Sequence, residues 1–154
     1  MAIQVSHNRN WQRKSKSPTN GCRLCFPRSS TISERRSMRI ELGHLPLPEL
    51  NPNKKLHHMK KYFFIQQAKE EAMIRAIQAG RPMEPFKKAH ITITFIAKDK
   101  RRRDLDNLFA SMKAYIDGIV HAGVLEDDDA DHVSYTIQFE RGEEDNTIID
   151  IERK

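Results

Sequence analysis

Between residues 90 and 121 a strand pattern passes into a helix pattern, and this handover constrains the fold more than any other feature. Residues 90–98 alternate isoleucine, threonine and phenylalanine, which predicts a β-strand. From Asp104, apolar residues recur at helical spacing as far as Ile119, and Gly123 follows, so we expect a helix over 104–121 with Asp104 as its N-cap. A strand that leads into such a helix indicates a domain of mixed α and β structure.

Similar patterns on both sides complete the expected fold. Strands are expected over 39–43, 133–139 and 147–152, a helix over 56–79, and loops over 44–55, 80–86, 124–131 and 141–146. The last two strands are expected to form a hairpin. The fold class is therefore α+β, a small mixed sheet with two main helices in the order β-α-β-α-β-β. The apolar stretches are too short to span a membrane and no secretory signal is recognisable, so we expect a cytoplasmic protein.

Composition changes at Met38, which divides the chain into two parts. Residues 1–37 hold eight Lys/Arg and one acid, a net charge of +7, whereas 38–154 hold nineteen Lys/Arg and twenty acids, a net charge of −1. We expect 1–37 to be a basic, flexible extension that contacts nucleic acid non-specifically, and 38–154 to be the folded domain. Met38 is also a candidate alternative start. Cys22 and Cys25 have the spacing of half a zinc site, but the chain has no second pair, so free thiols are expected.

Two pairs of carboxylates are the candidate site. Asp104 and Asp106 follow five cations in the six residues 98–103, and Asp127 and Asp128 lie in the acidic run 126–129. Carboxylates bind Mg²⁺, and cations beside them attract a polyanion, so the pattern favours metal-dependent chemistry on nucleic-acid phosphates. A simpler reading makes Asp104 a helix cap and the run 126–129 a solvated turn.

The expected helix separates the two acidic pairs. Seventeen residues of helix place its ends ~25 Å apart at 1.5 Å per residue. Either the chain folds back after Gly123, or the opposite ends of two subunits come together in a dimer with composite sites. Lys113 lies seven residues after Asp106, on the same side of the helix, where it can contact a phosphate.

From about Met38 onward the sequence resembles the RusA family of Holliday-junction resolvases, small endonucleases of phage and prophage origin. The resemblance rests on the run Arg-Arg-Asp-Leu-Asp-Asn-Leu at 102–108, then Lys113-Ala114, Asp117-Gly118, Gly123 and the acidic pair. The proline-rich loop with Asn51 and the basic segment 54–61 resemble the family more loosely.

The resemblance implies a homodimeric, magnesium-dependent enzyme that binds four-way DNA junctions and nicks two opposing strands. It assigns Mg²⁺ binding to Asp104, Asp106, Asp127 and Asp128. The family has a catalytic lysine where this chain has Ala110, and the resemblance transfers that role to Lys113, three residues later. Counting from Gly123 selects Asp127 and Asp128 as the acidic pair, whereas counting back from Tyr135 selects Asp128 and Asp129.

Three functions are thus open. The first is a crossover junction endodeoxyribonuclease acting in DNA recombination and repair, with Asp104, Asp106, Asp128 and Lys113 as catalytic residues. Basic side chains would hold the DNA backbone, namely Lys54, Lys55, Lys60, Lys61, Arg101, Arg102 and Arg103. The second, motivated by Ala110, is a junction- or nucleic-acid-binding protein without nuclease activity. The third is an adaptor that binds nucleic acid through its basic tail, with acids that only cap and solvate.

Overall fold

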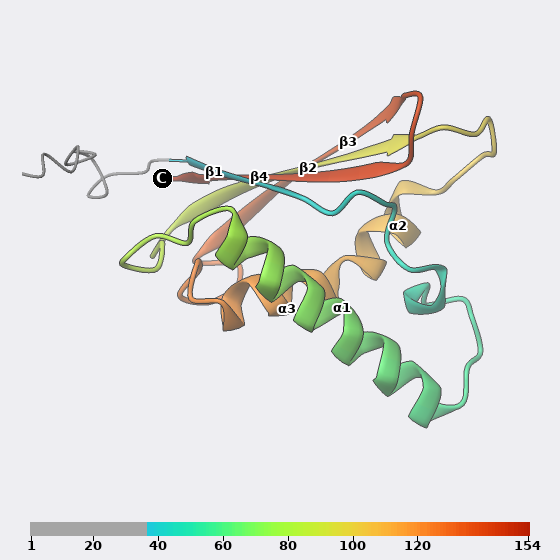
Figure 1. Ribbon diagram of the computed structural model, residues 1–154, viewed down its shortest axis with the longest axis horizontal. Coiled ribbons are helices and arrows are strands. Elements are labelled where there is room, and N and C mark those ends of the chain that lie inside the picture. The colour runs from blue at the N-terminus through green and yellow to red at the C-terminus, as the bar shows by residue number, and fades with distance from the viewer. Residues whose placement is uncertain (1–36) are drawn as a thin grey trace, which may run out of the picture. The chain divides into compact units, whose positions relative to one another are not determined.

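The computed structural model describes residues 37–154, and these form a two-layer α+β domain (Figure 1). The expectations for residues 1–36, including Cys22 and Cys25, lie outside the described residues. The elements are β1 (Ser37–Glu41), the 3₁₀ turn η1 (Pro48–Leu50), α1 (His58–Gln78), β2 (Ala89–Ala97), α2 (Leu105–Ser111), α3 (Lys113–His121), β3 (Val133–Arg141) and β4 (Asn146–Arg153). Every expected strand and helix is present, with ends shifted by a few residues.

The four strands form one mixed sheet in the order β1-β4-β2-β3. β2 and β3 are parallel, while β4 runs antiparallel to both β1 and β2. The helices lie on one face of the sheet (Figure 1). The mixed sheet with helices on one face confirms the expected α+β fold class. Parallel neighbours such as β2 and β3 need a crossover connection, and α2 and α3 provide it.

The predicted hairpin of the last two strands is wrong, because β4 pairs with β1 and β2 and not with β3. The connection after β3 crosses the end of β2: the amide of Gly142 donates to the carbonyl of Ala97 (3.2 Å). Burial gives the physical reason. Thr147, Ile149 and Ile151 of β4 are buried, so β4 takes a central place, whereas Val133 is the only buried residue of β3, which forms an edge.

The second main helix is divided at Met112. The Met112 amide donates to Phe109 (2.9 Å), a tightened i to i−3 bond, and α3 then begins at Lys113. Met112 itself is fully buried. A local break of this kind keeps the apolar residues on one face and leaves their spacing unchanged. For this reason the sequence pattern predicted one continuous helix.

The core lies between the sheet and the helices. It is built from large side chains of the sheet, among them Ile91, Ile93, Phe95, Ile149 and Ile151, together with small side chains of α1 and large ones of α3, among them Ala68, Ala72, Ala76, Tyr115 and Ile119. The two helices touch closely at Gly118, where an added Cβ would lie 2.3 Å from the Lys69 carbonyl oxygen and 2.9 Å from the Ala72 Cβ. This contact fixes α3, and with it Lys113, against α1. Among residues 37–154, none of the helices combines the length and apolarity that crossing a membrane requires.

Candidate active site

Asp104 stands at the N-cap position of α2 but does not cap the helix with its side chain. Its backbone is extended (φ −90°, ψ 125°), and no side-chain capping hydrogen bond forms. Its Oδ2 instead accepts a 3.4 Å hydrogen bond from Asn107 Nδ2. The exposed Asp106 makes no polar contact with residues 37–154. Both carboxylates therefore remain accessible, which the simple capping interpretation of Asp104 does not explain.

Asn107 links this turn to the loop after η1. While its Nδ2 donates to Asp104, its Oδ1 accepts a 3.0 Å hydrogen bond from Asn53 Nδ2. Asn53 is held in turn, since its amide donates to Asn51 Oδ1 (2.9 Å). Sequence reasoning noted Asn107 within its motif but assigned it no role, and it missed Asn53. Only the fold brings these two residues together, because 54 positions separate them.

After α3 the chain folds back on itself, one of the two alternatives left open by the sequence. Gly123 adopts a positive φ of 75°, and the amide of Val124 donates to Ile119 (3.3 Å). An isolated parallel bridge between Phe86 and Leu125 then directs the acidic run back along α3. Asp128 consequently lies beside Lys113, at the start of α3. The axial distance from Asp104 to this level of the helix is ~14 Å, instead of the ~25 Å to its far end.

Lys113 joins two carboxylates. Its Nζ pairs with Asp128 Oδ2 and lies 3.1 Å from Asp117 Oδ1, while Lys69 Nζ lies 3.0 Å from Asp117 Oδ2. The hydrogen bond to Asp128 is the main cause of the raised pKa of Lys113, with Asp117 contributing. Partial burial acts to raise the pKa of Asp117, but the two lysines outweigh it and hold that pKa below its usual range. Lys113 is therefore a positioned, fully protonated cation.

The three consecutive aspartates have different surroundings. Asp129 Oδ1 accepts the amides of Asp131 (3.1 Å) and His132 (3.0 Å) and also pairs with the His132 ring, so it builds the turn that enters β3. The hydrogen bond from His132 lowers the pKa of Asp129 and raises that of His132. Asp127 Oδ1 accepts only the amide of Asp128 (2.7 Å). Asp129 is thus the aspartate with most contacts inside the loop, whereas Asp127 and Asp128 each have one oxygen engaged within residues 37–154.

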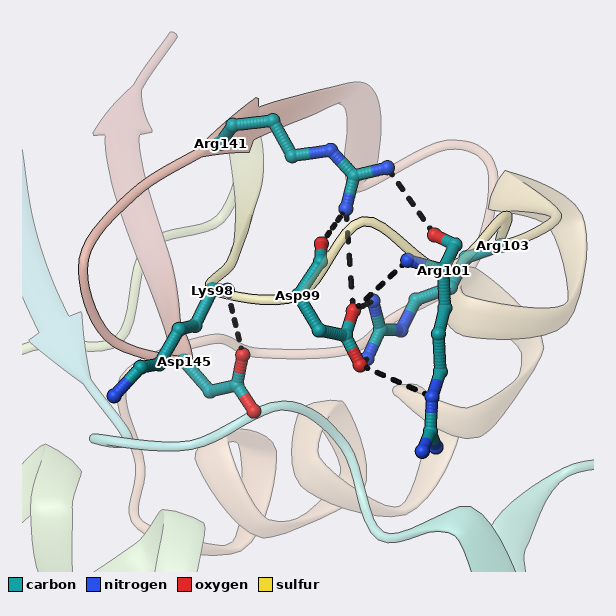
Figure 2. A network of polar contacts seen from close by, with 6 residues as sticks. All are labelled: Lys98, Asp99, Arg101, Arg103, Arg141 and Asp145. Carbon is teal, nitrogen blue, oxygen red and sulfur yellow. Dashed lines mark hydrogen bonds and ion pairs between the residues drawn. The ribbon is translucent and has the colours of Figure 1, made fainter.

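The arginine run before α2 is ordered around Asp99 (Figure 2). Arg103 donates to both carboxylate oxygens of Asp99 and is the main cause of its lowered pKa. Arg141 reaches across from the end of β3 to the carbonyls of Asp99 and Arg101 (3.1 Å to the latter). Sequence reasoning missed Asp99 and Arg141, because about forty positions separate them.

Because the loop is fixed in this way, the three arginine side chains differ in exposure and in ion pairing. The Arg103 side chain is only 20% exposed and donates to both oxygens of Asp99, whereas that of Arg101 is 85% exposed and pairs with Asp99 only through its Nε, at 3.5 Å (Figure 2). Arg102 is exposed and has no polar partner within the described part of the chain. Arg102 is therefore the unpaired cation of this run within residues 37–154, and Arg101 is exposed enough to bind a phosphate beside its ion pair with Asp99.

The second basic cluster leads into α1. Lys54, Lys55, Lys60 and Lys61 are all exposed, and of these only Lys54 has an ion pair within residues 37–154, at 3.7 Å from Glu49. Between and after them stand Met59, Tyr62 and Phe63, each at least 60% exposed. These first turns of α1 project away from the sheet (Figure 1).

A groove of about 260 Å³ lies between α1 and the divided helix, with Ile65 and Ala114 on its apolar floor. Ala110, Lys113 and Asp117 all line it, together with Lys61. A side chain at position 110 and the side chain of Lys113 therefore reach the same space.

The side chains of the site include the type of ligand atom that Mg²⁺ binds. Asp104, Asp106, Asp127 and Asp128 provide accessible carboxylate oxygens, the ligands this ion prefers. Within residues 37–154, however, no three side chains of the His, Cys, Asp or Glu type are grouped closely enough to enclose an ion. The chain thus presents two acidic pairs, one at the start of α2 and the other in the loop that follows α3.

Comparison of the chain with protein-family models finds no match, and comparison with curated proteins finds none of significance.

Proposed function

We propose that the protein is a magnesium-dependent, structure-selective endonuclease that resolves four-way DNA junctions by paired nicks, as its resemblance to the RusA family implies. The observation that carries this proposal is the contact of Asp128 with Lys113. It brings the acidic run back to Lys113 at the start of α3, the helix that follows the turn with Asp104 and Asp106. Such an enzyme acts on DNA in the cytoplasm of a bacterial or phage-infected cell.

Each side chain has a role in this proposal. Asp104 and Asp106, with Asp127 and Asp128, would hold the Mg²⁺, which when bound supplies a more acidic water and stabilises charge on the leaving oxygen. Asn107 orients Asp104 through its amide. Lys113 donates to a phosphate oxygen as negative charge develops there, and Asp117 keeps its ammonium group in place.

The cations around the site hold the DNA. Arg101, Arg102 and the lysines of 54–61 are exposed on the same domain as the acids, so they can contact backbone phosphates without reading the sequence. Arg103 contributes mainly by shaping the loop, because Asp99 already occupies its guanidinium.

Two nicks in opposing strands require two sites, and we propose a homodimer for that reason. The exposed Met59, Tyr62 and Phe63 at the projecting end of α1 are an apolar surface that a second subunit would cover. A dimer also offers a way to gather more than two carboxylates around one ion, as the sequence analysis anticipated.

The test is cleavage of a synthetic four-way junction by purified protein in Mg²⁺. Asp104→Asn and Asp128→Asn are expected to reduce product at least a hundredfold, because each removes a charged ligand. Asp131→Asn is the matched control: Asp131 lies in the same acidic loop and is exposed, but its carboxylate has no role in the proposal. If both variants cleave as well as wild type, the nuclease proposal fails.

A second function is favoured by one specific observation. Lys113 already neutralises Asp128, and Ala110 stands where the family has its lysine. A junction-binding protein without nuclease activity would therefore bind four-way junctions tightly but yield no product at any Mg²⁺ or Mn²⁺ concentration. Product that depends on Asp104 excludes this alternative.

A further inference from the structure

A pocket of about 640 Å³ is lined by Asp104 and the arginine run, and the roles proposed above leave its apolar wall unexplained. It lies between the loop 44–51 on one side and the arginine run with the first turns of α2 on the other. Backbone phosphates of a duplex bind to surface cations and need no hollow. A volume of this size is typical of sites that enclose a small organic group.

The walls of the pocket are fixed before any ligand binds. On one side, His44 Nε2 lies 2.8 Å from Glu71 Oε1, and the His44 carbonyl accepts a hydrogen bond from Thr147 Oγ1 (2.8 Å). The Leu47 amide donates to the Tyr115 hydroxyl (3.4 Å). On the other side, the Asp99 network holds the arginine run (Figure 2). A preformed pocket loses little free energy in ordering itself around a ligand.

The lining combines three kinds of group that can hold a ligand, beside the carboxylates of Asp104 and Asp145. Leu45, Pro46, Leu47 and Pro48 form an apolar wall, and the side chains of Asn51 and Asn107 offer amide donors and acceptors. Arg101 and Arg102, whose guanidinium groups are accessible, stand at the arginine side. An apolar ligand would make no use of the exposed Arg101 and Arg102 or of the remaining hydrogen-bonding capacity of the two amides, and a bare phosphate would leave the apolar wall empty. A flat heterocycle joined to a phosphate satisfies all three.

We infer that this pocket is a binding site for one nucleotide, which in a bound junction is a nucleotide unstacked from its strand near the branch point. The inference rests on the proposed function, and it adds a subsite to it. The base packs against the Leu45–Pro48 wall with its edge toward Asn51 and Asn107. Its phosphate pairs with Arg101 and Arg102. Unstacking costs a few kcal/mol, and least where pairing is already interrupted, as at a branch point.

The first experiment places 2-aminopurine at successive positions around the branch point of a synthetic junction, in EDTA so that the strands stay intact. Fluorescence is expected to rise at one position when full-length protein binds, because the base there leaves the stack. Leu47→Trp fills the pocket without changing charge and is expected to remove the rise, while Leu47→Met keeps it. No rise at any position, or an unchanged rise with Leu47→Trp, overturns the inference.

The second experiment does not depend on junction binding or on the folding of Leu47→Trp. Titration of the wild-type protein with dAMP or dTMP is expected to shift the side-chain amide NMR signals of Asn51 and Asn107 at millimolar concentration. Arg102→Ala should weaken this binding about tenfold, because it removes one charge-assisted hydrogen bond. Arg153→Ala is the control, because Arg153 pairs with Ala89 at the opposite end of β2.

The outcomes separate this inference from the nuclease proposal. If inorganic phosphate produces the same shifts as the nucleotides, or if no shifts occur, the nucleotide site is refuted even when junctions are cleaved. If the nucleotides shift both amides but junctions are neither bound nor cut, the pocket stands and the proposed function fails.

Discussion

Asp128 accepts a hydrogen bond from Lys113, fifteen positions earlier in the chain. Lys113 begins α3 and Asp128 follows it, so the contact exists only because the chain reverses at Gly123. The reversal brings the acidic run from the far end of α3 back to the lysine at its start.

Replacement of Lys113 by alanine should slow junction cleavage by roughly 10²- to 10³-fold, the usual effect of losing one group that stabilises transition-state charge. Junction binding should change little, because many other cations hold the DNA. Single-turnover cleavage and a gel-shift titration measure the two effects. Lys87→Ala is the matched control, since Lys87 is exposed and lies outside the site. Equal rates for both variants would remove Lys113 from the mechanism.

Asp117→Asn should destabilise the fold modestly, by ~1 kcal/mol or less, because Lys69 and Lys113 lose a shared partner that is partly screened by solvent. The folded-state pKa of Asp117 lies below its ordinary value of 3.8, so its contribution is present above that pH and is lost as the pH falls through the lowered value. Urea unfolding of both proteins at several pH values measures this. A difference that persists unchanged well below pH 3.8 contradicts the prediction.

Gly118→Ala should destabilise the protein by about 1–3 kcal/mol, the range for overpacking a close contact. The added Cβ would collide with the Lys69 carbonyl oxygen and the Ala72 Cβ, and the first of these is backbone that cannot turn aside. Thermal unfolding measures the loss, and Gly118→Ser should cost more than alanine. A variant as stable as wild type would show that α1 and α3 do not pack this closely.

Phe63→Glu should convert a dimer into a monomer and abolish paired nicking, because it places a charge in the exposed apolar surface at the start of α1. Ile77→Glu is the control: Ile77 is 53% exposed near the other end of the same helix and should leave the dimer intact. Analytical ultracentrifugation gives the oligomeric state. A monomeric wild-type protein that still makes paired nicks would contradict the dimer.

Deletion of residues 1–36 should weaken junction binding and reduce its salt dependence, while cleavage persists. The removed segment carries eight Lys/Arg and one acid, and each lost phosphate contact lowers the slope of log K against log salt by about 0.9. Binding titrations at several salt concentrations measure the slope. Complete loss of binding would instead favour an adaptor that holds nucleic acid through its tail.

The elements of the domain could be predicted because their signals are local. Alternation over β2 and the apolar stripe from Leu105 to Ile119 follow directly from which side chains face the core. The position of β4 could not be predicted in this way. Its alternating pattern fits a hairpin with β3 equally well, and only the deeper burial of Ile149 and Ile151 selects the place between β1 and β2.

The candidate site likewise has features that local sequence predicts and features that only tertiary contacts decide. The sequence by itself determined which residue types are available, four aspartates, a lysine and an arginine run, because those depend on composition and spacing alone. Tertiary structure decided which of them meet: Asp128 with Lys113, Asp129 with His132, Arg103 and Arg141 with Asp99, Asn107 with Asn53. Most of these contacts join segments that lie far apart in the chain or follow a reversal of its direction. Their geometry is set by the packing of helices on the sheet. The free energy of that packing depends on residues from the whole domain, so no short stretch of sequence determines it.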